Sequence, residues 1–468
     1  MELKIRPAME LRPYQVEPVR KGIEFFKKEK SVPSIIVAPT AAGKSVIIGA
    51  ITAGVTAELD GNVLILQPSR ELLVQNYEKF RAFGGRASIY SASMDSRKIG
   101  NVTYATIGSI KNLGKLFKER GFKYLCIDEI DRFPRESSSM LGRFLAESGI
   151  THVLGLTATP LKLQTNLDVY RNTYSKLVML TSRSGKGNFF KEIIHVTQIQ
   201  ELTKLGYWAK LEYELYDVST AGLVYNSTKA EYTEASILKM YELNNVNERI
   251  KYKISELPDR KRILVFVPSV AAAKRLAAEV PNSAAVYGDM ADDDRDYAIR
   301  NFKAGRIRVV FNYGVLTVGF DYPELDCLIL GRVTSSLSLY YQIIGRGTRI
   351  HPDKKDCLIV DFGGLVQRFG KVEDFYYTQE KGVWKLYGAG GILLSGIPVH
   401  EIGKHTHETE SREKKIIMTF GVHKGVEVKL VPKSYRDWAL LNISWNQYNS
   451  HIKDELERIK EIETLQNV

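Results

Sequence analysis

Small and cationic residues come together where an apolar run ends, in a pattern suited to holding a phosphate chain. The run SIIVAPT leads through Ala41, Ala42 and Gly43 into Lys44 and Ser45. Small residues let backbone amides approach phosphate oxygens, Lys44 supplies positive charge, and the Ser45 hydroxyl can bind Mg²⁺. The predicted phosphate-binding loop comprises Thr40, Ala41, Ala42, Gly43, Lys44 and Ser45.

Two carboxylates, Asp128 and Glu129, follow a second apolar run, YLCI. Ligands of open parallel sheets bind at the carboxyl ends of strands. We expect Asp128 to hold Mg²⁺, directly or through water, and Glu129 to orient and deprotonate an attacking water. Capping of the next helix is the simpler reading of an isolated acidic cluster, but this cluster follows a phosphate-binding loop.

Two arginines in YQIIGRGTR are spaced to act together. Arg346 and Arg349 lie three residues apart, share a face of the predicted helix and follow Gln342. Across a cleft, their guanidinium groups can neutralise negative charge on a γ-phosphate during hydrolysis. A basic surface turn is the alternative.

Short β-branched runs separated by helical stretches must position these residues. SIIVAPT, NVLILQPS, YLCIDEI and HVLGLTAT are nearly continuous in apolarity, which is typical of parallel strands covered on both faces. Helices are expected between them, for example over residues 71–83, and the pattern restarts near residue 255. The sequence predicts an α/β fold with two parallel-sheet domains, residues 1–200 and 201–375. A linker and a small accessory domain are expected in residues 376–468.

Composition indicates a folded protein with an acidic partner. The 468 residues include 66 Lys and Arg against 54 Asp and Glu, a formal charge of +12 that favours nucleic acid, although membrane-surface proteins share it. Cys126, Cys327 and Cys357 each lie in an apolar run, as buried thiols on strands do. The absence of a signal peptide or an apolar span predicts a soluble, cytoplasmic protein.

In order and spacing, these motifs resemble those of superfamily 2 helicases over residues 9–370. APTAAGKS resembles motif I, DEID motif II, and QIIGRGTR the arginine-finger motif VI. The resemblance implies two RecA-like domains that bind ATP and Mg²⁺ between them. It also assigns further residues: Arg12 and Gln15 of LRPYQ to adenine, Thr157 and Thr159 of LTATP to coupling, and Gly319 and Asp321 of NYGVLTVGFDYPE, with Gln342, to the nucleotide site.

The same resemblance predicts a nucleic-acid path held by hydroxyls and backbone amides, without base recognition. QPSREL resembles motif Ia, and the predicted contacts are Ser69, Arg70, Thr106, Ser269 and Thr317. An ordinary turn or helix-cap role is the alternative for each of them.

Two features depart from this pattern or extend it. Ala41 stands where the middle of motif I often has glycine, and DEID is neither of the commonest forms of motif II.

Residues 412–436 carry seven basic and two acidic side chains in a pattern, FGxxKG…P…YxxW, that resembles small domains beside some phage and bacterial nucleic-acid enzymes. Either an accessory DNA grip or a structural unit with Tyr435 and Trp438 as its core fits this segment.

The compact motor, its LRPYQ start and DFGGLVQRFG after motif VI resemble UvsW-type helicases. That resemblance implies a monomeric DNA helicase or translocase acting on forked DNA or four-way junctions, independently of sequence. Three alternatives remain: an RNA helicase, a nucleotide-gated clamp on duplex, and the motor subunit of a restriction assembly. Stimulation of ATP hydrolysis by RNA or DNA, and the presence of strand displacement, distinguish them.

Overall fold

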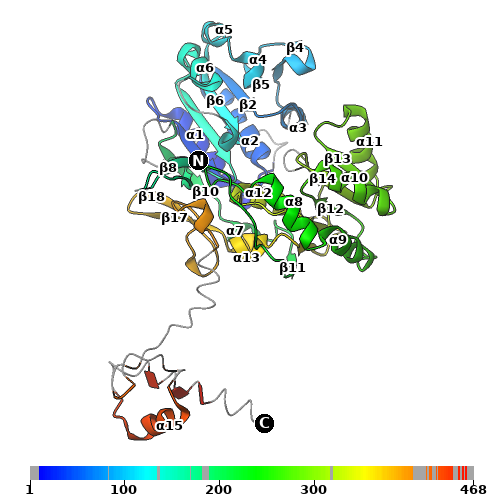
Figure 1. Ribbon diagram of the computed structural model, residues 1–468. Helices are drawn as coiled ribbons and strands as arrows, with labels where there is room; N and C mark the ends of the chain where they lie inside the picture. The colour runs from blue at the N-terminus through cyan, green and yellow to red at the C-terminus, as the bar shows by residue number, and fades with distance from the viewer. Residues whose placement is uncertain are drawn as a thin grey trace. The chain divides into compact units, whose positions relative to one another are not determined.

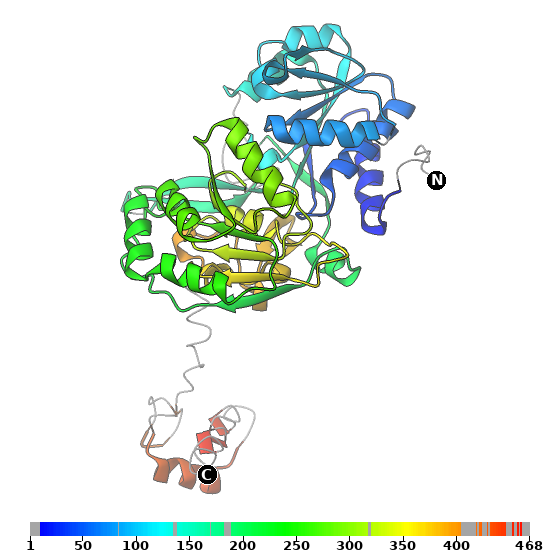
Figure 2. The same ribbon diagram turned by 90° about the vertical axis from the view of Figure 1, so that its right-hand side faces the viewer.

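The computed structural model describes residues 10–82, 84–133, 138–168, 170–181, 189–316 and 320–403, with short stretches between 418 and 460. The chain divides into two units, Met1–Ile402 and Gly403–Val468. The larger unit has two lobes, each with its own sheet (Figures 1 and 2). This two-lobed α/β architecture confirms the fold class expected from the sequence.

The first lobe is built on a sheet of eight described strands in the order β10-β1-β7-β6-β2-β5-β3-β4. All neighbours are parallel except β3 and β4. The central strands are buried because helices cover both faces. The strands are β1 (Ser34–Val37), β2 (Asn62–Gln67), β3 (Ser88–Ser91), β4 (Ser96–Arg97), β5 (Val102–Thr106), β6 (Phe122–Asp128), β7 (His152–Thr157) and β10 (Glu192–Val196).

The strand order explains why residues far apart in sequence meet. β1, β7 and β6 are neighbours and run parallel, so the segments that follow them emerge at the same edge of the sheet. Adjacent strands lie about 4.8 Å apart. The predicted phosphate loop, the acidic pair and the LTATP segment are therefore brought together by the topology.

Two close-packed helices support the loop that follows β1. The helices of this lobe are α1 (Pro13–Lys27), α2 (Lys44–Glu58), α3 (Arg70–Ala82), α4 (Ile107–Ile110), α5 (Gly114–Glu119) and α6 (Met140–Ser148). A Cβ on Gly22 of α1 would come within 2.4 Å of Ile51, and a Cβ on Gly54 of α2 within 2.4 Å of Ile23. Each glycine thus receives an isoleucine of the opposite helix, which fixes α2 against the body of the lobe.

The second lobe carries six described parallel strands in the order β11-β16-β15-β12-β14-β13. They are β11 (Leu211–Leu215), β12 (Ile263–Phe266), β13 (Ser283–Tyr287), β14 (Val309–Tyr313), β15 (Cys327–Leu330) and β16 (Cys357–Asp361). Its helices are α8 (Glu234–Leu243), α9 (Val246–Ser255), α10 (Val270–Glu279), α11 (Asp292–Lys303), α12 (Leu337–Ile344) and α13 (Leu365–Phe369). Residues 197–210, which contain α7 (Ile199–Lys204), join the two sheets.

Two antiparallel hairpins stand outside these sheets. β8 (Leu161–Leu167) pairs with β9 (Thr173–Met179), and β17 (Tyr376–Glu380) pairs with β18 (Val383–Tyr387). The structure differs here from the linker expected from residue 376, because the larger unit continues to Ile402. Gly390 and Gly391, in the segment expected to be a linker, lie in a 3₁₀ helix, η4 (Ala389–Gly391). Gly382, at the tip of the second hairpin, has φ of 78°.

The smaller unit has a separate core. Its described part contains α15 (Lys433–Asn442) and six buried residues, Met418, Val428, Val431, Ala439, Ile452 and Leu456. Tyr435 is partly buried against this core, whereas Trp438 is 47% exposed. Near the end of the sequence, the apolar residues Ile452 and Leu456 belong to this core. Two further apolar residues, Ile462 and Leu465, lie outside the described residues.

The structure bears out the expectation for the three cysteines. Cys126, Cys327 and Cys357 are buried free thiols on β6, β15 and β16, as predicted. Among the helices of the described ranges, none combines the length and apolarity that crossing a bilayer requires.

Candidate functional site between the two lobes

The predicted phosphate loop connects β1 to α2. Lys44 is the first residue of α2, and Gly43 before it has φ of 76°. Ala41 is also left-handed, with φ of 64°, a conformation that costs an alanine about 1 kcal/mol. This geometry gives a physical reason for the glycine that related loops often carry at that position. Backbone turned in this way presents N–H groups to an anion at the positive end of a helix.

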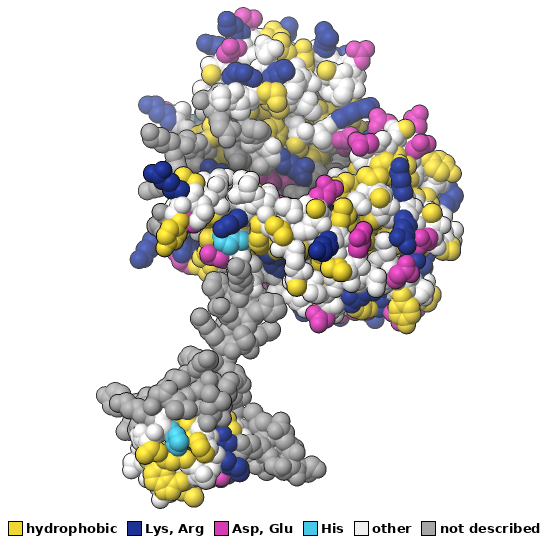
Figure 3. Space-filling model, viewed as in Figure 1, with side chains coloured by type: hydrophobic (Ala, Val, Ile, Leu, Met, Phe, Trp, Pro, Cys, Tyr) yellow, Lys and Arg dark blue, Asp and Glu magenta, His cyan; other side chains and the backbone are white. Residues whose placement is uncertain are grey.

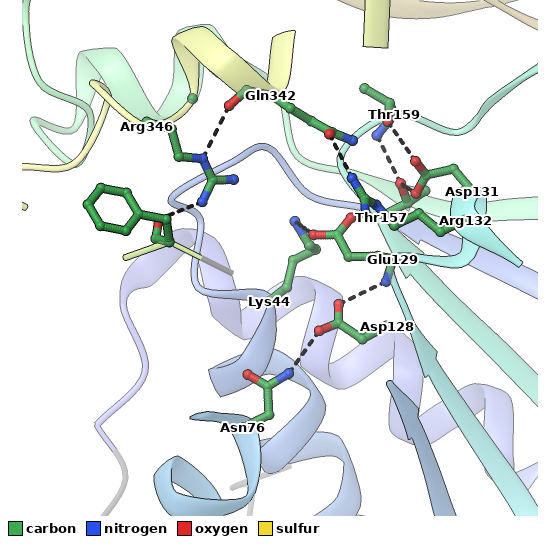
Figure 4. A network of polar contacts seen from close by, with 12 residues as sticks. Lys44, Asn76, Asp128, Glu129, Asp131, Arg132, Thr157, Thr159, Gln342 and Arg346 are labelled. Atoms are coloured by element: carbon green, nitrogen blue, oxygen red, sulfur yellow. Dashed lines mark hydrogen bonds and ion pairs between the residues drawn. The ribbon is translucent and has the colours of Figure 1, made fainter. Parts of the chain in front are cut away.

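Lys44 meets the acidic pair that ends β6. Its Nζ lies 3.1 Å from Oε1 of Glu129, and both side chains are largely shielded from solvent (Figure 4). Asp128 is buried and accepts hydrogen bonds from Asn76 Nδ2 at 2.8 Å and from the Glu129 amide at 3.0 Å. Glu129 itself adopts φ of 48°, which turns its side chain away from the strand direction.

Burial dominates the electrostatics of Asp128. Burial and the neighbouring Glu129 carboxylate raise the pKa of Asp128 to about 7, although Lys44 and the two hydrogen bonds oppose that rise. A buried carboxylate beside a second carboxylate favours a cation between them. The surroundings of Asp128 thus oppose the ionised form of its carboxyl group.

The LTATP segment is hydrogen-bonded to the end of motif II. Thr157 Oγ1 donates to Asp131 Oδ1 at 2.6 Å, Thr159 Oγ1 donates to Asp131 Oδ2 at 3.2 Å, and the Thr159 amide donates to Thr157 Oγ1 at 2.9 Å. Burial, followed by the nearby Glu129, raises the pKa of Asp131. The two threonines therefore connect β7 to the turn that carries Glu129.

The second lobe directs both predicted arginines into the same space. Arg346 is buried, with Nη1 donating to the Phe320 carbonyl at 2.7 Å and Nε to the Gln342 carbonyl at 3.2 Å. Burial, and then the neighbouring Arg349, lower the pKa of Arg346 to about 9. Arg349 forms an ion pair with Asp321, which orients its guanidinium group.

Contacts between the lobes hold these groups across a narrow gap. Arg132 Nη2 donates to Gln342 Oε1 at 2.9 Å (Figure 4), and Gln75 Nε2 donates to Asp321 Oδ2 at 3.2 Å. Gly345, at the end of α12, lies against Thr40 of the phosphate loop. The lobes are therefore in direct contact at the loop, at motif II and at α3.

One cavity of about 150 Å³ gathers these residues. Ligand pockets commonly measure roughly 300–1,000 Å³, so the gap between the lobes is nearly closed. From the first lobe the lining includes Pro39, Thr40, Ala41, Gly43, Lys44, Ser45, Leu72, Gln75, Asn76, Lys79, Asp128, Glu129 and Ala158. From the second lobe it includes Asp321, Gln342, Arg346 and Arg349.

The lining suits a nucleotide phosphate chain with Mg²⁺. The Ser45 hydroxyl and the Asp128 carboxylate both face the cavity, and oxygen ligands of this kind are those that Mg²⁺ prefers. Lys44, Arg346 and Arg349 line the same cavity as cations for phosphate oxygens. The buried carboxylate of Asp128, next to that of Glu129, fits a bound divalent cation.

The LRPYQ segment contacts the phosphate loop from behind. Gln15 Nε2 donates to the Ala42 carbonyl at 2.8 Å, and Gln15 Oε1 accepts from the Arg12 amide at 3.1 Å. The Arg12 guanidinium lies 4.7 Å from the ring centroid of Tyr207. These bonds assign Gln15 a role in shaping the loop, while recognition of adenine by Arg12 and Gln15 stays a prediction.

The predicted strand contacts lie at helix starts. Ser69 Oγ accepts from the Leu72 amide at 3.3 Å, Ser269 Oγ accepts from the Ala272 amide at 3.1 Å, and Thr106 Oγ1 lies 3.0 Å from Ser109 Oγ. The helix-cap alternative is therefore present in each serine, and Arg70 is exposed beside Ser69. Strand binding by these residues stays a prediction, and Thr317 and Gly319 lie outside the described residues.

Several residues of the site were missed by sequence reasoning. Asp131 is the last residue of DEID and Arg132 follows it, so their closeness to the acidic pair was the signal that could have identified them. Gln75 and Asn76 sit on α3 without any motif, so only the packing of α3 against the end of β6 reveals their contacts.

Comparison with known proteins identifies both lobes. Residues 8–162 match the family described as type III restriction enzyme, res subunit, and residues 245–351 match the helicase conserved C-terminal domain. The two matches fall on the two lobes in the order expected for a two-lobed motor. Over these two ranges the chain is similar to superfamily 2 helicases.

Individual relatives are distant in sequence. The protein irc3 of Schizosaccharomyces pombe, whose name describes a mitochondrial ATP-dependent helicase, is 26% identical over 83% of this chain and 66% of its own length. The DNA 3'-5' translocase XPB2 of Sulfurisphaera tokodaii is 25% identical over 76% of this chain and 82% of its own length.

A solved structure shares the fold. The ATP-dependent type ISP restriction-modification enzyme LlaBIII, solved bound to DNA, has a TM-score of 0.53 and 18% identity over 75% of this chain and 27% of its own. This chain thus spans less than two thirds of the length of both irc3 and LlaBIII.

Proposed function

We propose that this chain hydrolyses ATP in the cleft between its lobes and uses that reaction to move along or remodel DNA. One observation carries the proposal: Lys44 and Glu129 from the first lobe, and Arg346 and Arg349 from the second, line a single cavity. Neither lobe supplies both the Lys44 and Glu129 pair and the two arginines. Hydrolysis in such a site requires the lobes to close, which links the reaction to a change of shape.

Each side chain has a distinct task in this reaction. Lys44 binds the β- and γ-phosphates, and Glu129, only 3.1 Å from Lys44, orients the water that attacks the γ-phosphorus and takes its proton. Arg346 and Arg349 neutralise the charge that develops on the transferred phosphoryl group. Ser45 and Asp128 would hold Mg²⁺, which supplies charge neutralisation at the phosphate oxygens.

Two structural connections transmit the nucleotide state. Thr157 and Thr159 bind Asp131, whose neighbour Arg132 donates to Gln342 of the second lobe. Loss of the γ-phosphate removes the ligand that Arg346 and Arg349 share with Lys44, and the lobes then separate. Alternating closure and opening would move the predicted strand contacts of the two lobes relative to each other.

DNA is the proposed polymer and branched DNA the proposed substrate. The charge of +12 favours a polyanion, and the relative XPB2 is named as a DNA translocase. The resemblance of LRPYQ and DFGGLVQRFG to UvsW-type helicases supports a forked or four-way substrate. Contacts through hydroxyls and backbone amides predict binding that is independent of sequence.

The test is ATP hydrolysis by the purified chain, measured without polymer and with single-stranded DNA, forked DNA, a four-way junction and RNA. We expect the greatest stimulation with branched DNA. Glu129→Gln should reduce turnover by about 10²-fold or more while DNA binding persists, because the general base is lost and the phosphate contacts stay.

Normal turnover by Glu129→Gln would exclude Glu129 as the base. Stimulation chiefly by RNA would favour an RNA helicase and leave the ATPase proposal in place. The absence of stimulation by any polymer would contradict the motor proposal itself.

A second candidate is the motor subunit of a restriction assembly. It is favoured by the match of residues 8–162 to a family described by the res subunit of type III restriction enzymes. Such a motor moves on duplex without separating its strands. ATP-dependent displacement of a triplex-forming strand from duplex, with no unwinding of a fork, would favour this candidate over the helicase.

A further inference from the structure

A groove lies between the two hairpins, away from the nucleotide cavity. Two hollows of about 430 and 400 Å³ share Met179 of β9 and Val383 and Trp384 of β18. We call them together the hairpin groove. Its charged and aromatic lining consists of Lys176, Lys191, Glu192, Lys381, Trp384 and Lys385.

The lining of the hairpin groove combines an aromatic surface with positive charge. Four lysines face one glutamate, and Glu192 already accepts a hydrogen bond from Ser34 Oγ at 3.0 Å. Lys385 is paired with Glu380 at 2.6 Å, and Lys176 and Lys381 add further positive charge to the lining. Figure 3 shows Lys or Arg and hydrophobic side chains next to each other over the β17–β18 hairpin, at the left of the view.

These are the chemical groups that hold a nucleic-acid strand without reading its sequence. Lysines attract phosphates, and an indole lets a base stack at about 1–3 kcal/mol per base. Trp384 is partly buried against the core and lines both hollows. The two hollows, of about 430 and 400 Å³, lie within the usual range of binding pockets, roughly 300–1,000 Å³.

The hairpin groove is separate from the strand path predicted from motif resemblance. Lys191 and Glu192 lie at the amino end of β10, an edge strand, whereas Ser69 and Thr106 follow the carboxyl ends of β2 and β5. In the sheet, β1, β7 and β6 separate β10 from β2. At about 4.8 Å per strand, this separation is roughly 20 Å, and the two locations are at opposite ends of the parallel strands.

The hairpin that carries Trp384 is attached to the nucleotide site. Tyr377 OH donates to the carbonyl of Ala158, which lines the cavity beside Thr157. The Tyr377 backbone exchanges two hydrogen bonds with the Gln198 side chain in the segment between the lobes, at 3.0 and 2.6 Å. The hairpin is therefore hydrogen-bonded directly to the LTATP segment.

We propose that the hairpin groove binds a second nucleic-acid segment, the additional arm of a branched DNA, through its lysines and by base stacking on Trp384. This inference rests on the proposed function. It names the part of the surface that distinguishes a fork from a linear strand. Because Tyr377 joins the hairpin to Ala158, occupancy of the groove also increases ATP turnover.

The test compares a fork with a single strand of the same length. Binding is measured by fluorescence anisotropy over a range of salt concentrations, and ATP turnover is measured with both substrates. The test variant is Lys176→Ala with Lys381→Ala, and its matched control is Lys30→Ala with Lys239→Ala, two lysines outside the groove. Trp384→Phe and Trp384→Ala test the stacking surface separately.

We expect the test variant to bind the fork about tenfold more weakly, with the slope of log K against log salt reduced by about 1 to 2. Its affinity for the single strand and its turnover without polymer should be unchanged. Trp384→Ala should weaken fork binding, and Trp384→Phe should restore most of it because a phenyl ring still stacks.

The groove proposal would be overturned if the test variant lost equal affinity for the fork and the single strand, or lost no affinity for either. In that case, stimulation of the wild-type ATPase by DNA would still support the proposed motor function. If no polymer stimulates the wild-type chain, the proposed function has failed instead. Competition by polyglutamate as strong as that by DNA would indicate an acidic protein segment as the occupant and would also overturn the proposal.

Discussion

At the scale of single residues, Asp128 is suited to the reaction, but its buried charge lowers the stability of the folded chain. Its carboxylate is buried next to Glu129, and burial and that neighbour raise its pKa to about 7. Groups held in such environments are often functional, because a ligand supplies the charge that the protein withholds. The same argument predicts a gain in stability when the charge is removed.

Asp128→Asn should raise the melting temperature in EDTA at pH 8, by an amount corresponding to on the order of 1 kcal/mol. An acid with a raised folded-state pKa destabilises the fold above that pKa, and this cost disappears as pH falls from about 7 toward 4. The advantage of the asparagine should therefore shrink over that range. Thermal melts at pH 8, 6 and 4 measure it.

Asn76→Ala is a useful comparison. It removes the 2.8 Å hydrogen bond from Asn76 Nδ2 to Asp128 Oδ2, which stabilises the ionised carboxylate. It should lower the melting temperature at pH 8. An Asp128→Asn variant less stable than wild type at pH 8 would contradict the argument that the charge is costly.

At the scale of elements, α12 must end close to the phosphate loop for the arginines to reach the cavity. Gly345 has ordinary helical dihedral angles, so alanine is conformationally allowed there. Its role is spatial, because a Cβ would lie 2.6 Å from Thr40 Oγ1 and 2.7 Å from Thr40 Cβ. Both atoms belong to a buried residue with little room to move.

Gly345→Ala should reduce kcat for ATP by roughly ten- to a hundredfold, since a displacement of about 1 Å at reacting groups has effects of that size. Steady-state kinetics with saturating DNA measure the effect. The control is Gly288→Ala in the same lobe, where a Cβ meets nothing within 4 Å. Equal kcat values for the two variants would show that the contact with Thr40 is unimportant.

At the scale of the whole molecule, the chain has two units whose cores share no residue. The larger core extends through both lobes, whereas the smaller unit relies on six buried side chains. Small domains bury a lower fraction of their surface and are only marginally stable. Damage to the smaller core should therefore remain local.

Ile452→Ala should destabilise the smaller unit by about 2–5 kcal/mol, because it removes a fully buried side chain. Calorimetry should show the smaller transition lowered or lost, with the main transition and the ATP turnover without polymer unchanged. Ile48→Ala in the core of the first lobe is the matched substitution and should shift the main transition. A shift of the main transition by Ile452→Ala would indicate that the two units are coupled.

Local sequence determined the features that depend on neighbours along the chain. Apolar runs predicted the parallel strands because burial on both faces leaves no polar positions, and small residues before Lys44 predicted the turn that opens α2. Asp128, Glu129, Arg346 and Arg349 were identified in the same way, since each motif is contiguous. The formal charge of +12 and the burial of the three cysteines were likewise inferred without three-dimensional information.

Tertiary structure alone decided which distant segments meet. Nothing local marks Gln75 or Asn76 on α3. Packing within the first lobe brings Asn76 to Asp128, and the contact between the lobes brings Gln75 to Asp321. The sequence after residue 376 was expected to form a linker, but its first part forms the β17–β18 hairpin of the larger unit. Amino-acid composition indicates how flexible a segment can be, but it does not show which segment it pairs with. Tyr377, Trp384 and the hairpin groove depend on contacts across some 200 residues, which arise from packing of the whole unit and leave no local pattern.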